Sequence, residues 1–308
     1  MKKQPRLWAK KQPMAIARSH CPIASYKEKI YLFGGGGPDF KSLNSVTAYN
    51  PDNETWEKCT KMPTLRSGSV AITRNNKIYV MGGGFKQADG NFKFLKTVEI
   101  YHPESDTWET GPDLLMPHDY PATAALGNYI YVLGGHHPDA TRGGPKTDPG
   151  FNFCERLNLE TNTWEEIAPL PTARFALAAV TCDEKIHAMG GVAFTKEGFN
   201  NFNCIETFDP TNNSWQTDPS FELPWPAAGH GAAALGDNIY VFGGYSNDNI
   251  GDHGAAYNIK TKVWQQLPPM PTPRAAMGVT TTDSTIYIMG GWADDGRTPI
   301  SDIALLEV

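Results

Sequence analysis

Basic residues recur at a fixed distance before paired glycines, and this spacing is the clearest chemical signal in the sequence. In five of six cases the residue sixteen positions before a Gly-Gly pair is basic, although the net charge is −6. The six positions are Arg18, Arg66, His118, Arg174, Ala227 and Arg274. A guanidinium group offers forked donors that suit a carboxylate or a phosphate. The pattern predicts a site for an acidic peptide or a small anion, unless each arginine instead bonds loop carbonyls.

The glycine pairs themselves mark the elements that must position these side chains. Each pair ends a short apolar run, such as residues 30–33 before Gly34-Gly35 and residues 78–81 before Gly82-Gly83. The other pairs are Gly134-Gly135, Gly190-Gly191, Gly243-Gly244 and Gly290-Gly291. Runs of this length, rich in β-branched and aromatic residues, predict buried strands. The glycines then allow a sharp turn or a close approach to another backbone.

Tryptophan gives a second repeating signal. A large apolar residue stands seven positions before each of Trp56, Trp108, Trp164, Trp215 and Trp264. These apolar residues are Tyr49, Tyr101, Leu157, Phe208 and Tyr257. Turn-forming residues lie between the two members, so each segment predicts a hairpin with the tryptophan on its second strand.

Together these signals predict four strands in every repeat of about 50 residues, which is typical of a propeller blade. We therefore expect an all-β chain that forms one domain over residues 1–308, a six-bladed β-propeller. The last hairpin lacks its tryptophan strand, with Leu305 taken as the counterpart of Tyr49, whereas Leu7 and Trp8 precede the first blade. The N-terminal strand, at about residues 5–10, is thus expected to complete blade six and to protect the open sheet edges.

The paired glycine, the aromatic residue and the tryptophan together resemble the Kelch repeat. The pattern reads Gly82-Gly83, Tyr101, Trp108 in one blade and recurs along the whole chain. It departs from the family at Leu157 and Leu305, which replace the aromatic residue, and at His187, which replaces the usual tyrosine. Some Kelch substrate adaptors capture acidic peptides with arginines at this face. The resemblance extends that role to Arg18, Arg66, Arg174 and Arg274 only.

The loops that follow the glycine pairs are expected on the same face as the basic residues, around the mouth of the central channel. They carry aromatic and histidine side chains of the kind that anchor interfaces. The candidates are Phe85, His136, His137, Phe194, Tyr245 and Trp292. Some of these side chains are expected to tuck inward and cap the channel instead, because aromatic residues are often mostly buried.

Several function classes are disfavoured by composition. The acidic net charge, with a pI of about 5.8, disfavours nucleic-acid binding. No apolar run is long enough to span a bilayer, and no secretory signal is recognisable, so we expect a cytoplasmic protein. The five cysteines are sparse and lack metal-site spacing, which predicts reduced thiols and no zinc site. A closed ring leaves little unpaired edge, so a monomer is expected.

Two functions remain open at this level. The first is a binding module that holds a protein or an acidic peptide, without a cofactor, on the arginine-lined face. The second is a small-molecule enzyme, an isomerase, epimerase or lyase, that acts on an anionic substrate in the same channel mouth. In that case His118, His136, His137 and His230 would supply acid–base or metal chemistry. A deep pocket with converging histidines favours the enzyme, and a broad bowl favours the binding module.

Overall fold

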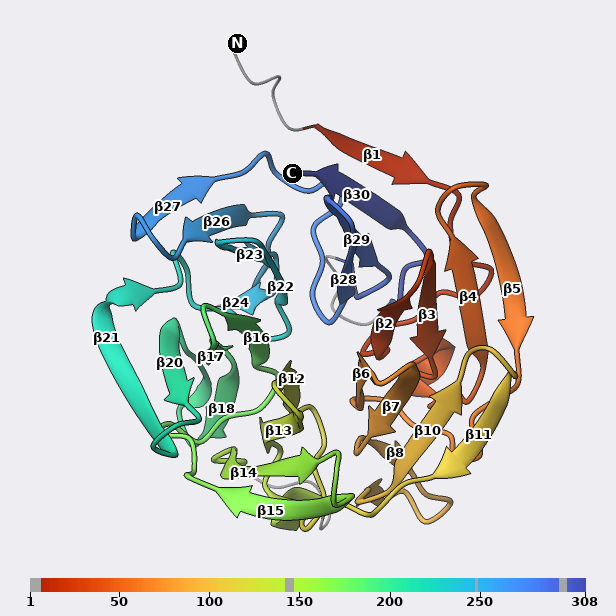
Figure 1. The fold of residues 1–308 in the computed structure, drawn as a ribbon, viewed down its shortest axis with the longest axis horizontal. Coiled ribbons are helices and arrows are strands. Elements are labelled where there is room, and N and C mark those ends of the chain that lie inside the picture. The colour runs from red at the N-terminus through yellow and green to blue at the C-terminus, as the bar shows by residue number, and fades with distance from the viewer. Residues whose placement is uncertain (1–6, 142–146, 247–248, 294–297) are drawn as a thin grey trace.

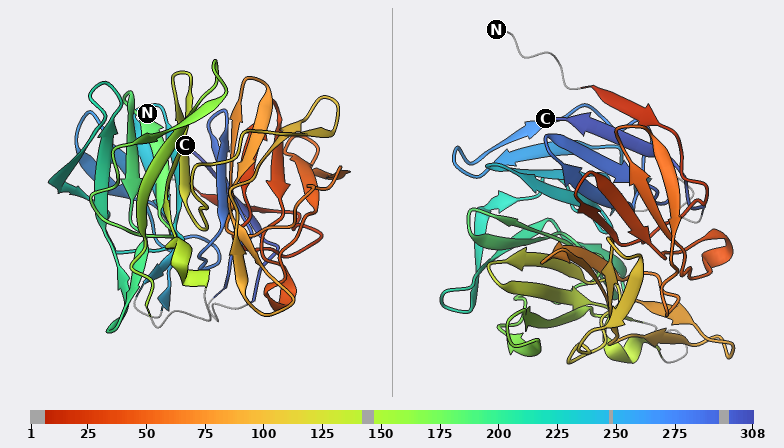
Figure 2. Two further views of the ribbon diagram at one scale, coloured as in Figure 1. Left: turned by 90° about the horizontal axis from the view of Figure 1, so that it is seen from below. Right: turned by 45° about the vertical axis from the view of Figure 1, so that its right-hand side comes forward.

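Six four-stranded antiparallel sheets stand around a central axis in this computed structural model, which describes residues 7–141, 147–246, 249–293 and 298–308. Each sheet is one blade, and its first strand lies nearest the axis (Figure 1). The predicted six-bladed β-propeller is therefore confirmed. Both short 3-10 helices, η1 (Pro38–Phe40) and η2 (Pro138–Thr141), lie at the same end of the ring (Figure 2).

The first three blades follow one another along the chain, each with its strands in order from the axis outward. Blade one contains β2 (Ile23–Tyr26), β3 (Lys29–Phe33), β4 (Val46–Asn50) and β5 (Thr55–Cys59). Blade two contains β6 (Val70–Arg74), β7 (Lys77–Met81), β10 (Val98–His102) and β11 (Thr107–Thr110). Blade three contains β12 (Ala122–Leu126), β13 (Tyr129–Gly135), β14 (Phe151–Asn158) and β15 (Thr163–Ile167).

The last three blades repeat this order, and the sixth takes its outer strand from the other end of the chain. Blade four contains β16 (Ala178–Cys182), β17 (Lys185–Met189), β20 (Cys204–Asp209) and β21 (Ser214–Glu222). Blade five contains β22 (Gly231–Leu235), β23 (Asn238–Phe242), β26 (Gly254–Asn258) and β27 (Val263–Gln266). Blade six contains β28 (Gly278–Thr282), β29 (Thr285–Met289), β30 (Ile303–Glu307) and β1 (Trp8–Lys11).

Blade six closes the ring as expected, with two refinements. Strand β1 pairs antiparallel with β30 and places Trp8 opposite Leu306 (Figure 1). It covers residues 8–11 rather than about 5–10, and residues 5 and 6 lie outside the described part. The counterpart of Tyr49 is Leu306 and not Leu305, because Tyr49 pairs with Ile30 and Leu306 with the equivalent Ile286. Spacing alone missed this shift because blade six has no hairpin tryptophan to fix the register.

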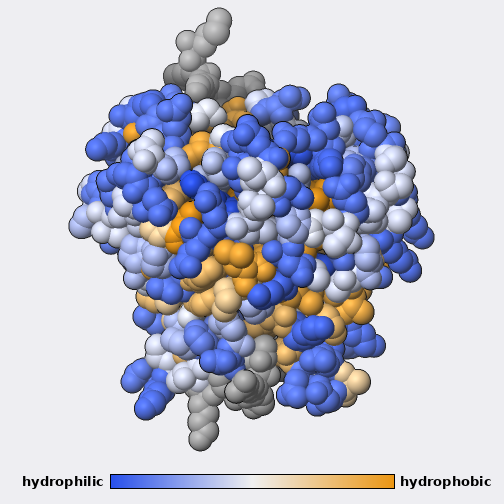
Figure 3. Space-filling view, turned by 60° about the horizontal axis from the view of Figure 1, so that its bottom comes forward, coloured by the Kyte–Doolittle hydropathy of each residue, from blue (hydrophilic) through white to orange (hydrophobic). Residues whose placement is uncertain are grey.

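The hydrophobic core lies between adjacent blades rather than in a single centre. In β3, Ile30 and Leu32 pack against blade six, whereas Tyr31 and Phe33 pack against blade two. Successive strand residues point to opposite faces, and both faces of each blade are covered. This two-sided burial explains why the runs before the glycine pairs are apolar throughout. In the space-filling view most of the surface is hydrophilic, and apolar residues show between the hydrophilic ones, most densely around the middle of this side (Figure 3).

The glycine pairs sit where neighbouring segments come too close for a side chain. Gly34 and Gly35 both adopt left-handed φ values, +51° and +92°. A Cβ on Gly34 would lie 2.7 Å from the carbonyl oxygens of Leu43 and Arg66. Glycine is therefore required here for both its backbone conformation and its small size.

Three small hairpins extend from the loops that follow the glycine pairs. They belong to blades two, four and five and were not foreseen in the sequence. Their strands are β8 (Gly84–Lys86) with β9 (Phe92–Phe94), β18 (Val192–Thr195) with β19 (Gly198–Asn201), and β24 (Tyr245–Ser246) with β25 (Asn249–Ile250). Within the described residues, no helix is both long and apolar enough to cross a membrane.

Candidate functional site

The four arginines of the repeat are buried between blades and do not line the channel mouth. Each has at most 1% of its surface exposed. The expected ring of exposed guanidinium groups is therefore wrong. Each arginine instead donates a hydrogen bond to a backbone carbonyl, which is close to the alternative given above. The four residues are Arg18, Arg66, Arg174 and Arg274.

Arg66 shows how each of these residues joins two blades. Its backbone belongs to the side of blade one: its N–H donates to Leu43 O, and its carbonyl accepts from Gly35 N, both at 2.9 Å. Its guanidinium reaches into blade two, where Nη1 donates to the carbonyls of Gly82 and Thr97 at 3.0 Å. Nη2 also lies 3.0 Å from the buried carboxylate of Glu99. The side chain thus satisfies carbonyls that the glycine turn would otherwise leave buried and unpaired.

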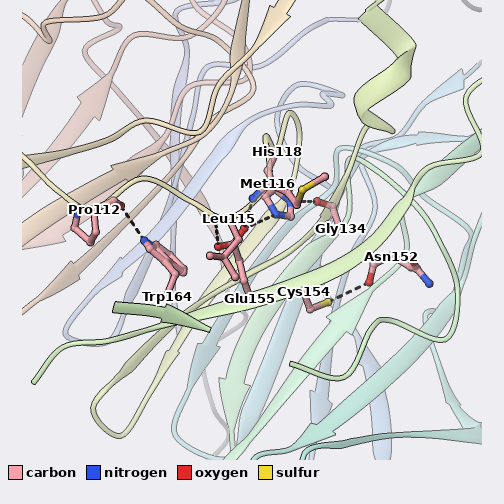
Figure 4. Close-up of polar contacts among 9 residues, drawn as sticks. All are labelled: Pro112, Leu115, Met116, His118, Gly134, Asn152, Cys154, Glu155 and Trp164. Carbon is pink, nitrogen blue, oxygen red and sulfur yellow. Dashed lines mark hydrogen bonds and ion pairs between the residues drawn. The ribbon is translucent and has the colours of Figure 1, made fainter. Parts of the chain in front are cut away.

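His118 joins blades two and three in the same way, by bonding a buried carbonyl and a buried carboxylate (Figure 4). Its Nδ1 donates to Gly134 O at 2.5 Å, and its Nε2 lies 3.1 Å from Glu155 Oε1. Glu155 in turn accepts hydrogen bonds from the backbone of Leu115 and Met116. His118 and Glu155 are both fully buried. His118 is therefore a structural residue and does not reach a ligand at the mouth.

Blade five has neither the cation nor the carboxylate. Ala227 stands at the basic position, and Ala255 stands where blades two, three and four have Glu99, Glu155 and Glu206. The carbonyl of Gly243 is instead bonded by Trp225 Nε1 at 3.1 Å. Blades two, three and four thus have both the buried cation and the buried carboxylate, whereas blades one and six have Arg18 and Arg274 with Thr47 and Ala304 at the carboxylate position.

Two residues beyond each basic position, the chain forms a closed ring of backbone hydrogen bonds around the axis. Each residue of this ring donates its N–H to the carbonyl of its counterpart in an adjacent blade connection, at 2.6–3.2 Å. The six members, called the floor ring below, are His20, Gly68, Tyr120, Ala176, Gly229 and Ala276. All six have left-handed φ values between 46° and 64°. Such values are uncommon for residues other than glycine, so the ring holds four side chains in a strained backbone.

Above the floor ring lies a cavity of about 550 Å³, called the bowl below. Its walls come from the loops and small hairpins that follow the glycine pairs. Aromatic side chains dominate them, and these are Phe92, Phe94, Tyr120, Phe175, Phe194, Phe199, Tyr245 and Trp292. Phe92 and Phe199 are about half exposed, at 49% and 56%. Apolar cavities with few polar groups are the usual form of ligand sites.

The aromatic rings of the bowl support one another in two groups. Phe199 packs on Phe194 at 4.9 Å and on Tyr245 at 6.1 Å between ring centroids. The His20 ring lies edge-on to Trp292 at 4.2 Å and to Tyr120 at 4.6 Å. Burial lowers the pKa of His20 to about 3, and the nearby His136 adds to this shift. His20 is therefore neutral at physiological pH.

Two carboxyl groups, Asp119 and Asp148, lie in the same bowl and are both 4% exposed. Burial raises the pKa of Asp119 well above its usual 3.8, and the charge of Asp148 adds to the effect. Burial alone would raise the pKa of Asp148, but the hydrogen bond and charge of His136, together with hydrogen bonds from the backbone of Gly150 and His137, outweigh burial and lower it. The His136 ring is stacked on Phe175 at 3.9 Å between centroids. The pKa values of the two carboxyls are thus shifted in opposite directions.

The remaining candidates come from the loops after the glycine pairs, and only some of them line the bowl. His136, Phe194, Tyr245 and Trp292 line the bowl. His137 lies outside it, edge-on to Phe151. Phe85 pairs with Lys93, so it points to the opposite side of its hairpin from Phe92 and Phe94.

Sequence reasoning assigned to the site only four of the residues that line the bowl and missed others, including Asp119, Tyr120, Asp148 and Phe175. A signal existed for some of them. His20 and Tyr120 stand two residues after a basic position of the repeat, and Asp119 and Phe175 one residue after. Asp148 has no counterpart in the repeat, since it comes from the long loop of blade three, where it bonds the backbone of Phe194.

The histidines do not converge as metal chemistry would need. His20 and His136 line the bowl, whereas His230 lies below the floor ring in a channel cavity of about 210 Å³. Burial lowers the pKa of His230 to about 4. No cluster of three or more potential metal ligands occurs in the described part of the chain.

Comparisons with known proteins agree with this architecture. Beta-scruin of Limulus polyphemus is 27% identical over 244 residues, which is 77% of this chain and 26% of that protein. Kelch repeat and BTB domain-containing protein 3 of Mus musculus is 27% identical over 270 residues, 81% of this chain and 41% of that protein. The chain therefore spans less than half the length of these relatives.

A solved structure and a family model complete the comparison. The structure of YjhT has a TM-score of 0.81, covers 97% of both chains and is 15% identical, which shows a shared fold. The model of the KLHDC2/KLHL20/DRC7 Kelch-repeats domain matches residues 4–191 and 121–308. Since these two overlapping matches together extend over nearly the whole chain, the protein belongs to the Kelch-repeat family.

Proposed function

We propose that this protein is an interaction module that holds a protein partner in the bowl. The aromatic lining of the bowl, with half-exposed Phe92 and Phe199, is the observation that carries the proposal. Aromatic residues in a concave patch form the energetic centres of interfaces, because they bury a large apolar area when the partner docks. Kelch propellers related to this chain are typically protein-interaction modules, which supports the same conclusion.

The chemistry of the bowl changes the expected partner. An acidic peptide would need cations at the mouth, yet the four repeat arginines are committed to carbonyls and carboxylates between the blades. Among the described residues, no lysine or arginine lines the bowl. Lys86 is the cross-strand partner of Phe92 in the β8–β9 hairpin, but its side chain is exposed and does not line the bowl. The partner is therefore expected to insert apolar or basic side chains rather than acidic ones.

The proposal is tested by removing the aromatic rim. The Phe92→Ser/Phe199→Ser variant is expected to lose the protein partners that the tagged wild-type protein captures from its native extract. Val263→Ser is the matched control, since Val263 is 59% exposed but lies on β27, the outer strand of blade five. Unchanged capture by the rim variant, with folding verified by its melting curve, would refute the bowl as the partner site.

A second candidate function is a small-molecule enzyme at the same place. The observation that favours it is the pair Asp119 and Asp148, whose pKa values are shifted in opposite directions, beside His136. Such a pair provides a proton donor and a proton acceptor in one pocket. Native mass spectrometry of the freshly purified protein distinguishes the candidates. A bound metabolite that disappears in Phe92→Ser/Phe199→Ser favours the enzyme, whereas a protein partner favours the interaction module.

A further inference from the structure

The bowl combines acidic groups with aromatic faces. Asp119 and Asp148 are its carboxyl groups, and its described lining contains no lysine or arginine to neutralise them. The aromatic residues Phe94 and Phe194 come from two of the small hairpins, Tyr120 and Phe175 come from two blade connections, and all four line the same cavity. Aromatic faces carry partial negative charge, so they attract a cation as the carboxylates do.

Asp119 is held rigidly in this environment. Its Oδ1 packs against two glycines, Gly68 of the floor ring and Gly84. A Cβ atom added to Gly68 would lie only 2.5 Å from this oxygen, and one added to Gly84 would lie 3.4 Å from it. No ion pair joins Asp119 to a basic side chain among the described residues. A buried carboxyl without a cationic partner is costly when ionised. Among the described residues, no basic side chain therefore offsets the charge of Asp119 when it ionises, and a positive group from a ligand would do so.

Asp148 is fixed from the other side. Its backbone N–H donates to Phe194 O at 2.8 Å, and its carbonyl accepts from Phe194 N at 2.7 Å. Its carboxylate accepts the Nδ1–H of His136, whose ring is also 5.2 Å from Tyr120 and 5.8 Å from Phe94. The second acidic group is thus surrounded by the aromatic rings that would contact a ligand.

We propose that the group seated in the bowl is the ammonium-bearing side chain of a lysine, free or N-methylated, presented by a protein partner. This inference rests on the proposed function of the bowl as the partner site. A lysine side chain fits the lining in both of its parts. Its methylene stem packs on the phenylalanines, and its ammonium group lies over aromatic faces near the carboxyl groups. A carboxylate or phosphate would instead face Asp148 and the aromatic faces, which repel it.

Binding of such a cation is coupled to a proton. Burial and the charge of Asp148 raise the pKa of Asp119 well above 3.8, so the bowl without a cation favours the protonated carboxyl. The titratable groups that face it are Asp148 and Tyr120, with His136 beyond Asp148 and His20 beside Tyr120. An arriving ammonium group favours the ionised carboxylate, so Asp119 releases its proton to solvent. Affinity for the cation should therefore rise as the pH rises.

The test uses isothermal titration of the intact protein with four blocked amino-acid probes, three of the lysine type and one glutamate. These are Nα-acetyl-lysine amide, its Nε-trimethyl form, the neutral isostere with carbon in place of the quaternary nitrogen, and Nα-acetyl-glutamate amide. The two ammonium probes are expected to bind, with the neutral isostere about tenfold weaker or more. Glutamate is expected not to bind. Equal binding of the neutral isostere, or any binding of the glutamate probe, overturns the proposal.

Variants and a free cation make the assignment sharper. Asp119→Asn is expected to weaken the trimethyl probe about fivefold or more and to abolish the proton release seen when buffers of different ionisation enthalpy are compared. Asp113→Asn is the control, because Asp113 is exposed and outside the bowl. Binding of choline more tightly than either lysine probe would overturn the assignment to a protein side chain.

The result separates this inference from the proposed function. If none of the ammonium probes binds while Phe92→Ser/Phe199→Ser still loses its partner, the bowl remains the partner site and the lysine assignment fails. If the ammonium probes bind the wild type while Phe92→Ser/Phe199→Ser keeps its protein partner, the proposed function fails and the bowl is a cation site for another kind of ligand.

Discussion

At the scale of single residues, burial decides what a basic side chain does. The repeat places a cation at the start of five blades, and the same residue type would serve either an exposed anion site or a buried network. The structure shows the buried network: Arg66, His118 and Arg174 pair with Glu99, Glu155 and Glu206. Because these guanidinium groups are shielded from water, burial lowers the pKa of Arg66 and Arg274. Substitutions there should change stability first.

The charge of Arg66 is expected to be essential for folding. Arg66→Glu would set a second carboxylate beside Glu99 in a site with no solvent, so we expect a loss of about 3–5 kcal/mol in the free energy of unfolding. Urea denaturation measures this loss. Lys58→Glu, an exposed charge reversal on β5, should change stability by no more than about 0.5 kcal/mol.

A paired substitution provides a check on the cause. Arg66→Met leaves Glu99 buried without its cation, whereas Arg66→Met/Glu99→Met removes both charges. The double variant should therefore be more stable than the single one, although it still leaves the carbonyls of Gly82 and Thr97 unbonded. A double variant that is less stable than Arg66→Met would contradict the ion pair as the reason.

Asp119 is expected to make stability depend on pH. Its folded pKa lies above the unfolded value near 3.8, so the folded state holds this proton more tightly. Its contribution to stability is full below pH 3.8 and is lost as the pH rises through the folded pKa. Asp119→Asn should therefore gain stability relative to the wild type as the pH is raised from 3 to 8. Urea midpoints across that range test this, and a constant difference would exclude the shifted carboxyl.

At the scale of elements, the repeat specifies the blades but not every detail of their loops. Apolar runs ended by Gly-Gly predicted the second strand of each blade, and the tryptophan spacing predicted the outer hairpins, as the pairing of Tyr49 with Trp56 confirms. The hairpins β8–β9, β18–β19 and β24–β25 have strands of two to four residues. Such short strands carry little periodicity, and they are formed by contacts with neighbouring loops.

The floor ring gives a prediction at this scale. Ala176 has a φ of 51° because its N–H and carbonyl are both held by ring neighbours. Glycine adopts this conformation without strain, so Ala176→Gly should stabilise the protein by up to about 1 kcal/mol. Ala178, two residues later in β16, is the matched control, and Ala178→Gly should cost about 0.5–1 kcal/mol. Thermal unfolding measures both, and equal losses in the two variants would contradict a strained ring.

At the scale of the whole molecule, closure joins the two ends of the chain. Strand β1 bonds β30, and Trp8 Nε1 donates to Pro268 O at 2.9 Å in the connection from blade five. Without β1, the outer edge of β30 would be open to solvent and to other strands. Blades five and six would also lose the packing of Trp8 on Phe242. The N-terminal strand is thus expected to support the whole ring.

Deleting residues 1–12 should therefore lower the melting temperature of the entire protein rather than release one local segment. The ring is a cyclic array in which each blade packs on two neighbours, so one weakened blade exposes both. Deletion of residues 1–6 is the control, since it leaves β1 intact. Scanning calorimetry tests both variants, and an unchanged melting temperature after the longer deletion would show that β1 is dispensable.

The sequence by itself determined the propeller, its six blades and its closure. Those features are set by local patterns: short runs that are apolar throughout, glycines at fixed turns and a hairpin spacing repeated along the chain. It also placed His136, Phe194, Tyr245 and Trp292 at the mouth, because each follows a glycine pair.

Only the tertiary structure decided the chemistry of the mouth. Whether the Arg174 side chain faces solvent or Glu206 depends on how the chain before blade four packs against that blade. No local pattern in the sequence reveals this packing. The choice between Phe85 and Phe94 depends on which side of a short hairpin faces the axis. Asp119 and Asp148 meet across different blade connections, and their opposite pKa shifts come from burial and from His136, which no spacing in the sequence encodes.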